Sequence, residues 1–137
     1  MTPDRRQRRV EGAFEGYPES VRAARAFVKA ALAAWDVDDL SEVAVLLTSE
    51  VAANAVLHAR SVYRLALELR RGPEVCIEVS DASTEVPRRR FAGPDAEGGR
   101  GLGLLEQLAA SWGTHEVEGG KAVWFTVRRA APEPAPS

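Results

Sequence analysis

The chain has 137 residues, of which 45% are hydrophobic and 28% charged, and its formal net charge is -2. This length suits one domain with a hydrophobic core, and the nearly balanced charge argues against a disordered chain and a nucleic-acid-binding surface. The only cysteine, Cys76, excludes an intramolecular disulfide and a cysteine-based zinc cluster, so we expect a cytoplasmic protein.

The two ends of the chain differ in composition from the rest. Residues 1–9 are rich in arginine and residues 130–137 in proline and alanine, so we expect two flexible tails around a domain at residues 10–129. We find no apolar core of a secretion signal and expect no membrane-spanning run of about 18 apolar residues. The sequence therefore predicts no membrane partner.

The first predicted elements are a strand and a helix. Residues 10–14 can form a short strand before Pro18, which fits the first turn of a helix. From Val21 to Trp35, apolar residues recur every three or four positions. This spacing predicts an amphipathic helix with one buried face.

A second helix and a pair of strands follow. Asp39 and Glu42 have the spacing of a capping box, so we expect a helix over residues 40–58. Alternation of apolar and polar residues over 62–70 predicts a half-buried strand, and the turn "RGPE" leads into another strand at 75–80. Strands that follow each other this closely favour antiparallel pairing.

The last third of the domain begins with a long loop. Residues 82–99 have no periodicity, and we interpret them as a lid, because loops of this length in compact domains are usually functional. "GLGLLEQLAASWG" then predicts a short helix, and two strands joined at Gly119 and Gly120 follow. The inward-facing residues of the last strand are Val123, Phe125 and Val127. The element order predicts an α+β two-layer sandwich, with helices on one face of a mixed, mostly antiparallel sheet.

The second helix carries a polar stripe in an apolar stretch. Glu50, Asn54 and His58 recur every four residues and therefore lie nearly above one another. Asn54 offers a neutral oxygen to a magnesium ion bound mainly by phosphates and water, and Glu50 could accept a proton from a hydroxyl group. One alternative is a solvent-facing stripe. Another is a Glu/His metal site, but His58 fits better as a helix-end residue, and the position of His115 is not fixed by the pattern.

Asp81 ends the strand that begins at Val75. Because strand residues alternate between faces, Asp81 falls on the same inward face as Ile77 and Val79. A buried carboxylate needs a hydrogen-bond donor, which a protein group or a ligand amine could supply. The alternative is a half-exposed aspartate that caps the next turn.

The glycine-rich segment "EGGRGLGLL" spans residues 97–105. Glycines that lead into a helix let backbone N–H groups approach an anion closely, which suits phosphates. The segment is not a P-loop, because leucines stand where Lys and Ser or Thr are required. It is not a Rossmann turn either, because no strand precedes it. A purely structural glycine-rich loop is the alternative.

In this order, the motifs "SEVAANAVLHA", "VSDASTEVP" and "GGRGLGLLEQLAASWG" resemble those of the Bergerat-type (GHKL) histidine-kinase-like ATP-binding fold. The resemblance is closest to the bacterial anti-sigma-factor serine/threonine kinases and extends over residues 10–128. Glycines commonly follow the aspartate in the wider superfamily, whereas this chain has Ser83 and Pro87 there, as the anti-sigma branch often does.

The resemblance implies a role for each matching residue. Asn54 would hold Mg²⁺ between ATP phosphates, Glu50 would be the general base, and Asp81 would accept the adenine amino group. Residues 82–98 would close over the nucleotide. The remaining residues of the implied nucleotide site are Ser83, Gly99, Arg100, Gly101, Leu102, Gly103 and Leu104.

The function implied by the resemblance is an ATP- and Mg²⁺-dependent protein kinase. Such a protein binds a sigma factor and phosphorylates a serine of an anti-anti-sigma protein of the STAS type, and it is usually a homodimer. The alternative is a non-catalytic docking module with the same nucleotide pocket. A histidine kinase would also need a pair of phosphoacceptor helices, for which we expect the N-terminal segment to be too short.

Overall fold

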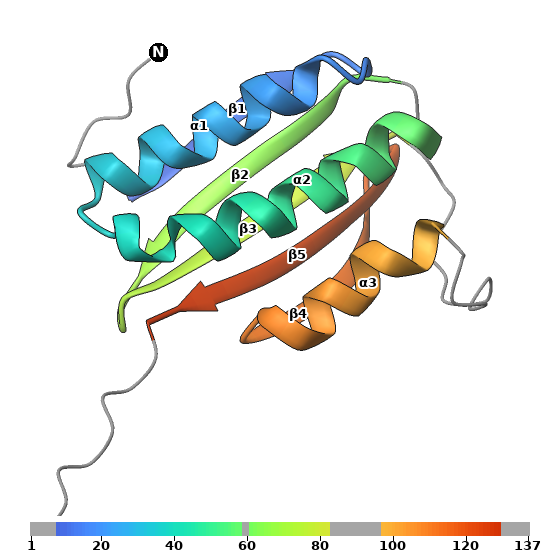
Figure 1. The fold of residues 1–137 in the computed structure, drawn as a ribbon. Coiled ribbons are helices and arrows are strands. Elements are labelled where there is room, and N and C mark those ends of the chain that lie inside the picture. Colours follow the sequence, from blue (N-terminus) through green and yellow to red (C-terminus); the bar gives the residue numbers. More distant parts are fainter. Residues whose placement is uncertain (1–7, 59–60, 83–96, 130–137) are drawn as a thin grey trace, which may run out of the picture.

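The computed structural model describes residues 8–58, 61–82 and 97–129, but not the side chains of residues 58 and 97–102. Its elements, in chain order, are β1 (Arg9–Phe14), α1 (Ser20–Ala34), the 3₁₀ turn η1 (Asp38–Leu40), α2 (Ser41–His58), β2 (Tyr63–Arg70), β3 (Glu74–Asp81), α3 (Glu97–Leu108), β4 (Ser111–Val117) and β5 (Gly120–Arg128). The helices lie on one face of the sheet (Figure 1). The predicted α+β sandwich is confirmed.

The five strands form one antiparallel sheet in the order β1-β2-β3-β5-β4. The alternation predicted for the central strands is confirmed, because every second residue is buried under the helices. These inner-face residues are Tyr63, Leu65, Leu67, Val75, Ile77, Val79, Val123, Phe125 and Val127. The outer face carries ion pairs such as Arg70–Glu68 at 2.8 Å. The core therefore lies between the sheet and the helices.

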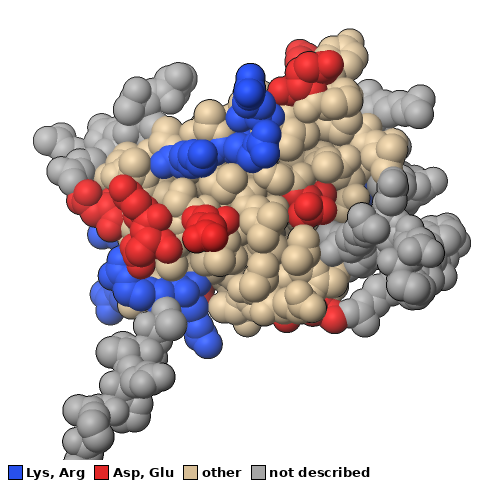
Figure 2. All heavy atoms as spheres, viewed as in Figure 1, with Lys and Arg blue, Asp and Glu red and all other residues tan. Residues whose placement is uncertain are grey.

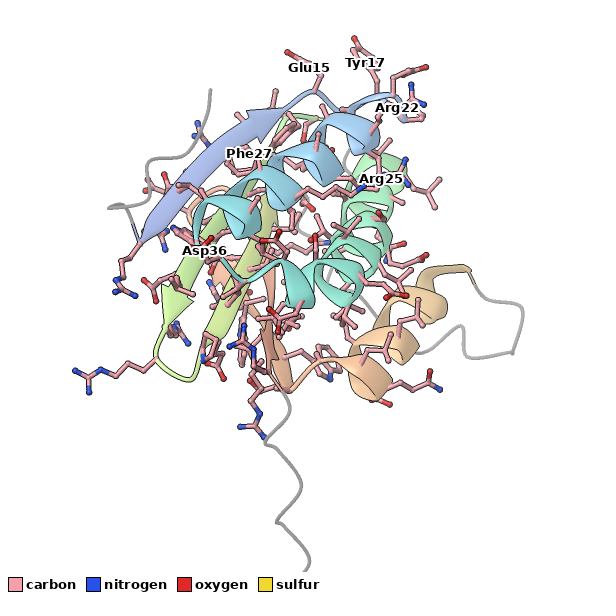
Figure 3. All side chains as sticks on the ribbon, turned by 60° about the vertical axis from the view of Figure 1, so that its left-hand side comes forward. Glu15, Tyr17, Arg22, Arg25, Phe27 and Asp36 are labelled. Atoms are coloured by element: carbon pink, nitrogen blue, oxygen red, sulfur yellow. The ribbon has the colours of Figure 1, made fainter. Side chains whose placement is uncertain are left out.

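The helix layer packs through apolar stripes. Val28 and Leu32 of α1 and Leu47 of α2 are completely buried. Phe27 points from α1 towards β1 (Figure 3), where its ring meets the ring of Phe14 edge-on at 5.6 Å between centroids. α2 lies between α1 and α3 over the middle of the sheet (Figure 1) and is the central core helix.

The limits of α3 differ from the prediction. α3 already begins at Glu97, so residues 99–103 are helical and do not form a glycine-rich turn. Glycine disfavours a helix by only about 1 kcal/mol per residue, and burial of Leu105 in the core offsets this cost. The helix also ends early, at Leu108, because residues 111–113 pair with β5.

Two smaller differences concern the start of the domain and the predicted cap. The N–H of Leu69 donates to the carbonyl of Arg8 at 2.8 Å, so the sheet begins before Val10. The Asp39 carboxylate does not act only as a local cap, because it accepts two hydrogen bonds of 2.7 Å from Arg129. This long-range ion pair joins η1 to the end of β5.

Contrary to the expectation from the sequence, one helical stretch, Asp38–Leu57, is long and apolar enough to cross a membrane by length and composition. In the fold, 44% of this stretch is buried, and α2 covers the sheet. The position of α2 as the central core helix accounts for its apolar composition.

Candidate functional site

The polar stripe of α2 lies along the edge of its buried face. Glu50 and Asn54 are half-buried, whereas Val51 and Ala55 beside them are buried and Ala53 is exposed. α2 lies between α1 and α3, with the sheet behind it (Figure 1). The two side chains are thus held by a rigid helix and remain accessible to a ligand.

His115 does not form a metal site with this stripe. His58 is the last residue of α2, and its side chain is outside the described part of the structure. His115 pairs with Ala122 on the outer face of the sheet, 3.4 Å from Glu78, whereas α2 covers the inner face. Among the described residues, no group of three or more His, Cys, Asp or Glu could hold a metal ion.

Asp81 is the last residue of β3, on the face predicted from the sequence. It is half-buried, and the inward-facing Val79 precedes it by two residues. The backbone of Gly120 passes very close to it. A methyl group added at Gly120 would overlap the carbonyl oxygen of Asp81 and lie 2.8 Å from Cα of Ala82. The start of β5 therefore fixes the backbone that carries Asp81.

The glycines of α3 are helical, but Gly103 has no structural reason to be glycine among the described contacts. A methyl group added there would meet nothing within 4 Å, and the residue has no positive φ. Alanine would favour the helix by about 1 kcal/mol. As far as the described residues go, the space beside Gly103 is free to take a ligand. Leu104, another predicted site residue, packs partly against the core.

The structure brings these elements to one end of the sheet. β3 finishes, β5 begins, α2 ends and α3 begins at the same end in Figure 1. Asn54, Asp81 and the glycine-rich start of α3 are thus on three segments that converge there. Ser83 and residues 84–96 of the predicted lid are outside the described residues, whereas Glu97 and Gly98 belong to α3.

Sequence analysis missed one residue at this end. Lys121 is buried, with 8% of its surface exposed, and it is the direct partner of Asp81 in the register of β3 and β5. The signal was available, because alternation from Val123 backwards puts Lys121 on the same inward face.

Elsewhere, two perturbed groups have structural explanations. The Cys76 thiol lies on the outer face of the sheet. Burial raises its pKa, and because the thiolate is the reactive form, Cys76 is a poor nucleophile. Burial also raises the pKa of Tyr63, and its hydroxyl is within 2.7 Å of the Ser20 hydroxyl. Cys76 lies away from the end that carries Asp81, opposite Glu68, whereas Tyr63 lies at that end, because its neighbour Arg64 pairs with Ser80.

The comparison with protein families decides the identity of the fold. The sequence model of the histidine kinase-like ATPase domain family matches residues 14–127 of the chain. The chain belongs to this family. A search of curated proteins finds no match to the chain. As a GHKL-type domain, the chain has a nucleotide-binding fold, and ATP is the nucleotide that the family description indicates.

The residues present fit the ATP and Mg²⁺ that the family implies. The half-buried Asn54 can offer its amide oxygen, while phosphates and water supply most of the other ligands that Mg²⁺ prefers. Gly103 lies inside α3, and the space beside it would let a phosphate approach the surface of this helix. The helix face of the domain carries both signs of charge (Figure 2), with Arg22 and Arg25 extending from α1 (Figure 3). The net charge of this face therefore does not by itself attract an anionic ligand.

Proposed function

We propose that this chain is an ATP-dependent serine/threonine protein kinase of the anti-sigma-factor type. It would bind a sigma factor and phosphorylate a serine of a STAS-type anti-anti-sigma protein. The observation that carries this proposal is the position of Glu50, one turn before Asn54, on a half-buried edge of the central core helix. The order of motifs along the chain and the membership in the ATPase family support it.

Each residue has a defined task in this proposal. ATP supplies the phosphoryl group, and Mg²⁺ neutralises part of its charge. Asn54 holds the ion beside α2, and Asp81 accepts a hydrogen bond from the adenine amino group. Glu50 takes the proton of the serine hydroxyl as its oxygen bonds to the terminal phosphorus of ATP and the bond from that phosphorus to ADP breaks, so that phosphoserine and ADP are formed. Glu50 is half-buried, so its carboxylate remains within reach of a partner protein.

We also propose that the protein is a cytoplasmic homodimer and that its partner proteins contact the exposed side of α2. Leu46 and Leu57 are 40% and 50% exposed on the outside of α2. Exposed leucines on the central helix offer apolar contacts to a protein partner, next to the edge that carries Glu50. Such a surface also supports the second candidate, a docking module that binds nucleotide and partner without transferring phosphate.

The test compares Glu50→Gln with Glu42→Gln, which changes an exposed glutamate in the first turn of the same helix. Glu50→Gln should lower phosphate transfer from ATP to a STAS-type protein by roughly 10²- to 10⁴-fold. It should leave ATP affinity unchanged, and Glu42→Gln should change neither quantity. Transfer by Glu50→Gln at the wild-type rate would refute the assignment of the base.

A second experiment separates the kinase from the docking module. Binding of a sigma factor is measured together with phosphate transfer, for the wild type and Glu50→Gln. The docking module predicts no transfer by the wild type and equal sigma-factor binding by both proteins. The kinase predicts transfer by the wild type only.

A further inference from the structure

Lys121 is a charged residue in an unusual place. It is buried on the inner face of the sheet, directly opposite Asp81 on β3 and Glu116 on β4. Directly opposite residues of antiparallel strands point to the same face, with Cβ atoms about 5 Å apart. The Lys121 side chain therefore begins next to Asp81, between two acidic neighbours.

Burial of a lysine has an energetic consequence. An ammonium group is rarely buried unless it is paired or hydrogen-bonded, because loss of water costs several kcal/mol. The chain contains only two lysines, and the other, Lys29, is exposed on α1. Lys121 thus places three hydrogen-bond donors at the end of the sheet where Asp81 supplies acceptors.

This pairing of donor and acceptor matches one edge of an aminopurine. The 6-amino group of adenine donates, and ring nitrogens N1 and N7, which flank it, accept. We propose that Lys121 is a second residue that recognises the base. Its ammonium group donates a hydrogen bond to N1 or N7 of adenine, while the Asp81 carboxylate accepts a hydrogen bond from the 6-amino group between them. The inference rests on the proposed function in so far as Asp81 reads the base of ATP.

A role in stability alone makes a different prediction. If Lys121 only balanced the charge of Asp81 and Glu116, its replacement would change the affinity for all purine nucleotides by the same factor. A base-reading lysine instead changes the ratio of affinities for ATP and for an analogue that lacks the ring acceptor. The ratio separates the two roles.

The experiment titrates ATP, 1-deaza-ATP and 7-deaza-ATP into the wild type, Lys121→Met and the control Lys29→Met by calorimetry. One deaza analogue should bind the wild type and Lys29→Met at least about 10-fold more weakly than ATP, the usual effect of losing a hydrogen bond to a charged group. In Lys121→Met, the ratio of the affinity for ATP to the affinity for that analogue should fall close to one. Equal ratios in the wild type and Lys121→Met would overturn the inference and leave the proposed function intact.

A spectroscopic measurement covers the case in which Lys121→Met does not fold. Protein labelled with ¹³C at lysine gives signals from two residues, which Lys29→Arg assigns. ATP should shift the Lys121 signals, and 7-deaza-ATP or 1-deaza-ATP should shift them less, while the Lys29 signals stay in place. Unchanged Lys121 signals at saturating ATP would overturn the inference, and a lack of ATP binding would overturn it together with the proposed function.

Discussion

The two ends of β3 use charge in opposite ways. At its start, Glu74 lies 3.9 Å from Arg70 on the outer face of the sheet, and nearby Arg129 pairs with Asp39 at 2.7 Å while both side chains are 48% exposed. At its finish, Asp81 and its partner Lys121 point inward, under the helix layer. The ions at the first end are exposed to water, whereas at the second end Lys121 is buried and Asp81 is half-buried.

This difference in exposure indicates a structural role for the charges at the start of β3 and a binding role for those at its finish. Exposed ion pairs contribute little to stability, because water and salt screen them. The register partners Asp81 and Lys121 lie at the end of the sheet where α2 ends and α3 begins, beside the segments that we propose to bind the nucleotide. Changes at the Asp81 end should therefore alter nucleotide binding, whereas changes at the Glu74 end should alter only the fold, and weakly.

The largest effect is expected for Gly120→Ala. Its methyl group would overlap the backbone of Asp81 and approach Cα of Ala82 to 2.8 Å, so β5 or β3 must shift. We expect the free energy of unfolding to fall by about 2–3 kcal/mol. Urea denaturation measures this fall. An unchanged midpoint would show that the contact between the two backbones is not tight.

Asn54→Ala should come next, with an effect on the ligand and not on the fold. Loss of the amide oxygen should weaken ATP binding in the presence of magnesium by about 10-fold or more. The weakening should disappear when magnesium is removed. Calorimetry measures both affinities, and Ser49→Ala, a change on the same helix, serves as the control. Equal weakening with and without magnesium would contradict the role of Asn54 as a metal ligand.

Gly103→Ala tests whether open space in α3 is kept for phosphates. Alanine in the helix should raise the free energy of unfolding by about 1 kcal/mol. The same methyl group should lower ATP affinity, because it occupies the space beside α3 in which we place the phosphates. Urea denaturation and ATP titration measure the two effects. A more stable protein with wild-type ATP affinity would remove Gly103 from the site.

The smallest effect is expected at the exposed end, for Arg129→Ala. The hydrogen bonds from Arg129 hold the pKa of Asp39 below its ordinary value. The pair therefore stabilises the folded state above the ordinary pKa of aspartate, and this contribution is lost as the pH falls through the lowered pKa. Urea denaturation of Arg129→Ala and Arg128→Ala should differ slightly at neutral pH and not at strongly acid pH. A difference independent of pH would contradict the ion pair.

Periodicity predicted the parts of the fold in which burial decides the structure. The alternation in β2 and β3 placed the core residues correctly, because a half-buried strand can hide only every second side chain. The same reasoning placed Asp81 on the inner face. The same reasoning places Lys121 on the inner face. That Lys121 lies opposite Asp81 is known only from the pairing of β5 with β3.

Other features depend on contacts between distant segments and could not be predicted. Asp39 has the spacing of a helix cap, but its carboxylate accepts a hydrogen bond from Arg129, which is 90 residues away. Trp112 fits a helical pattern and a strand pattern equally well, and its pairing with Phe125 assigns it to β4. The glycines before Leu105 have low helix propensity, which packing of α3 against α2 overrides.

The central claim is that Asp81, the stripe of α2 and the start of α3 surround one nucleotide. The most direct test is an ATP titration by calorimetry with magnesium, on the wild type, Asp81→Asn and Glu78→Gln, a change on the outer face of the same strand. We expect one ATP to bind the wild type and Glu78→Gln with equal affinity, and Asp81→Asn to bind it at least about 10-fold more weakly. No binding by the wild type, or equal affinity in all three proteins, would contradict the account.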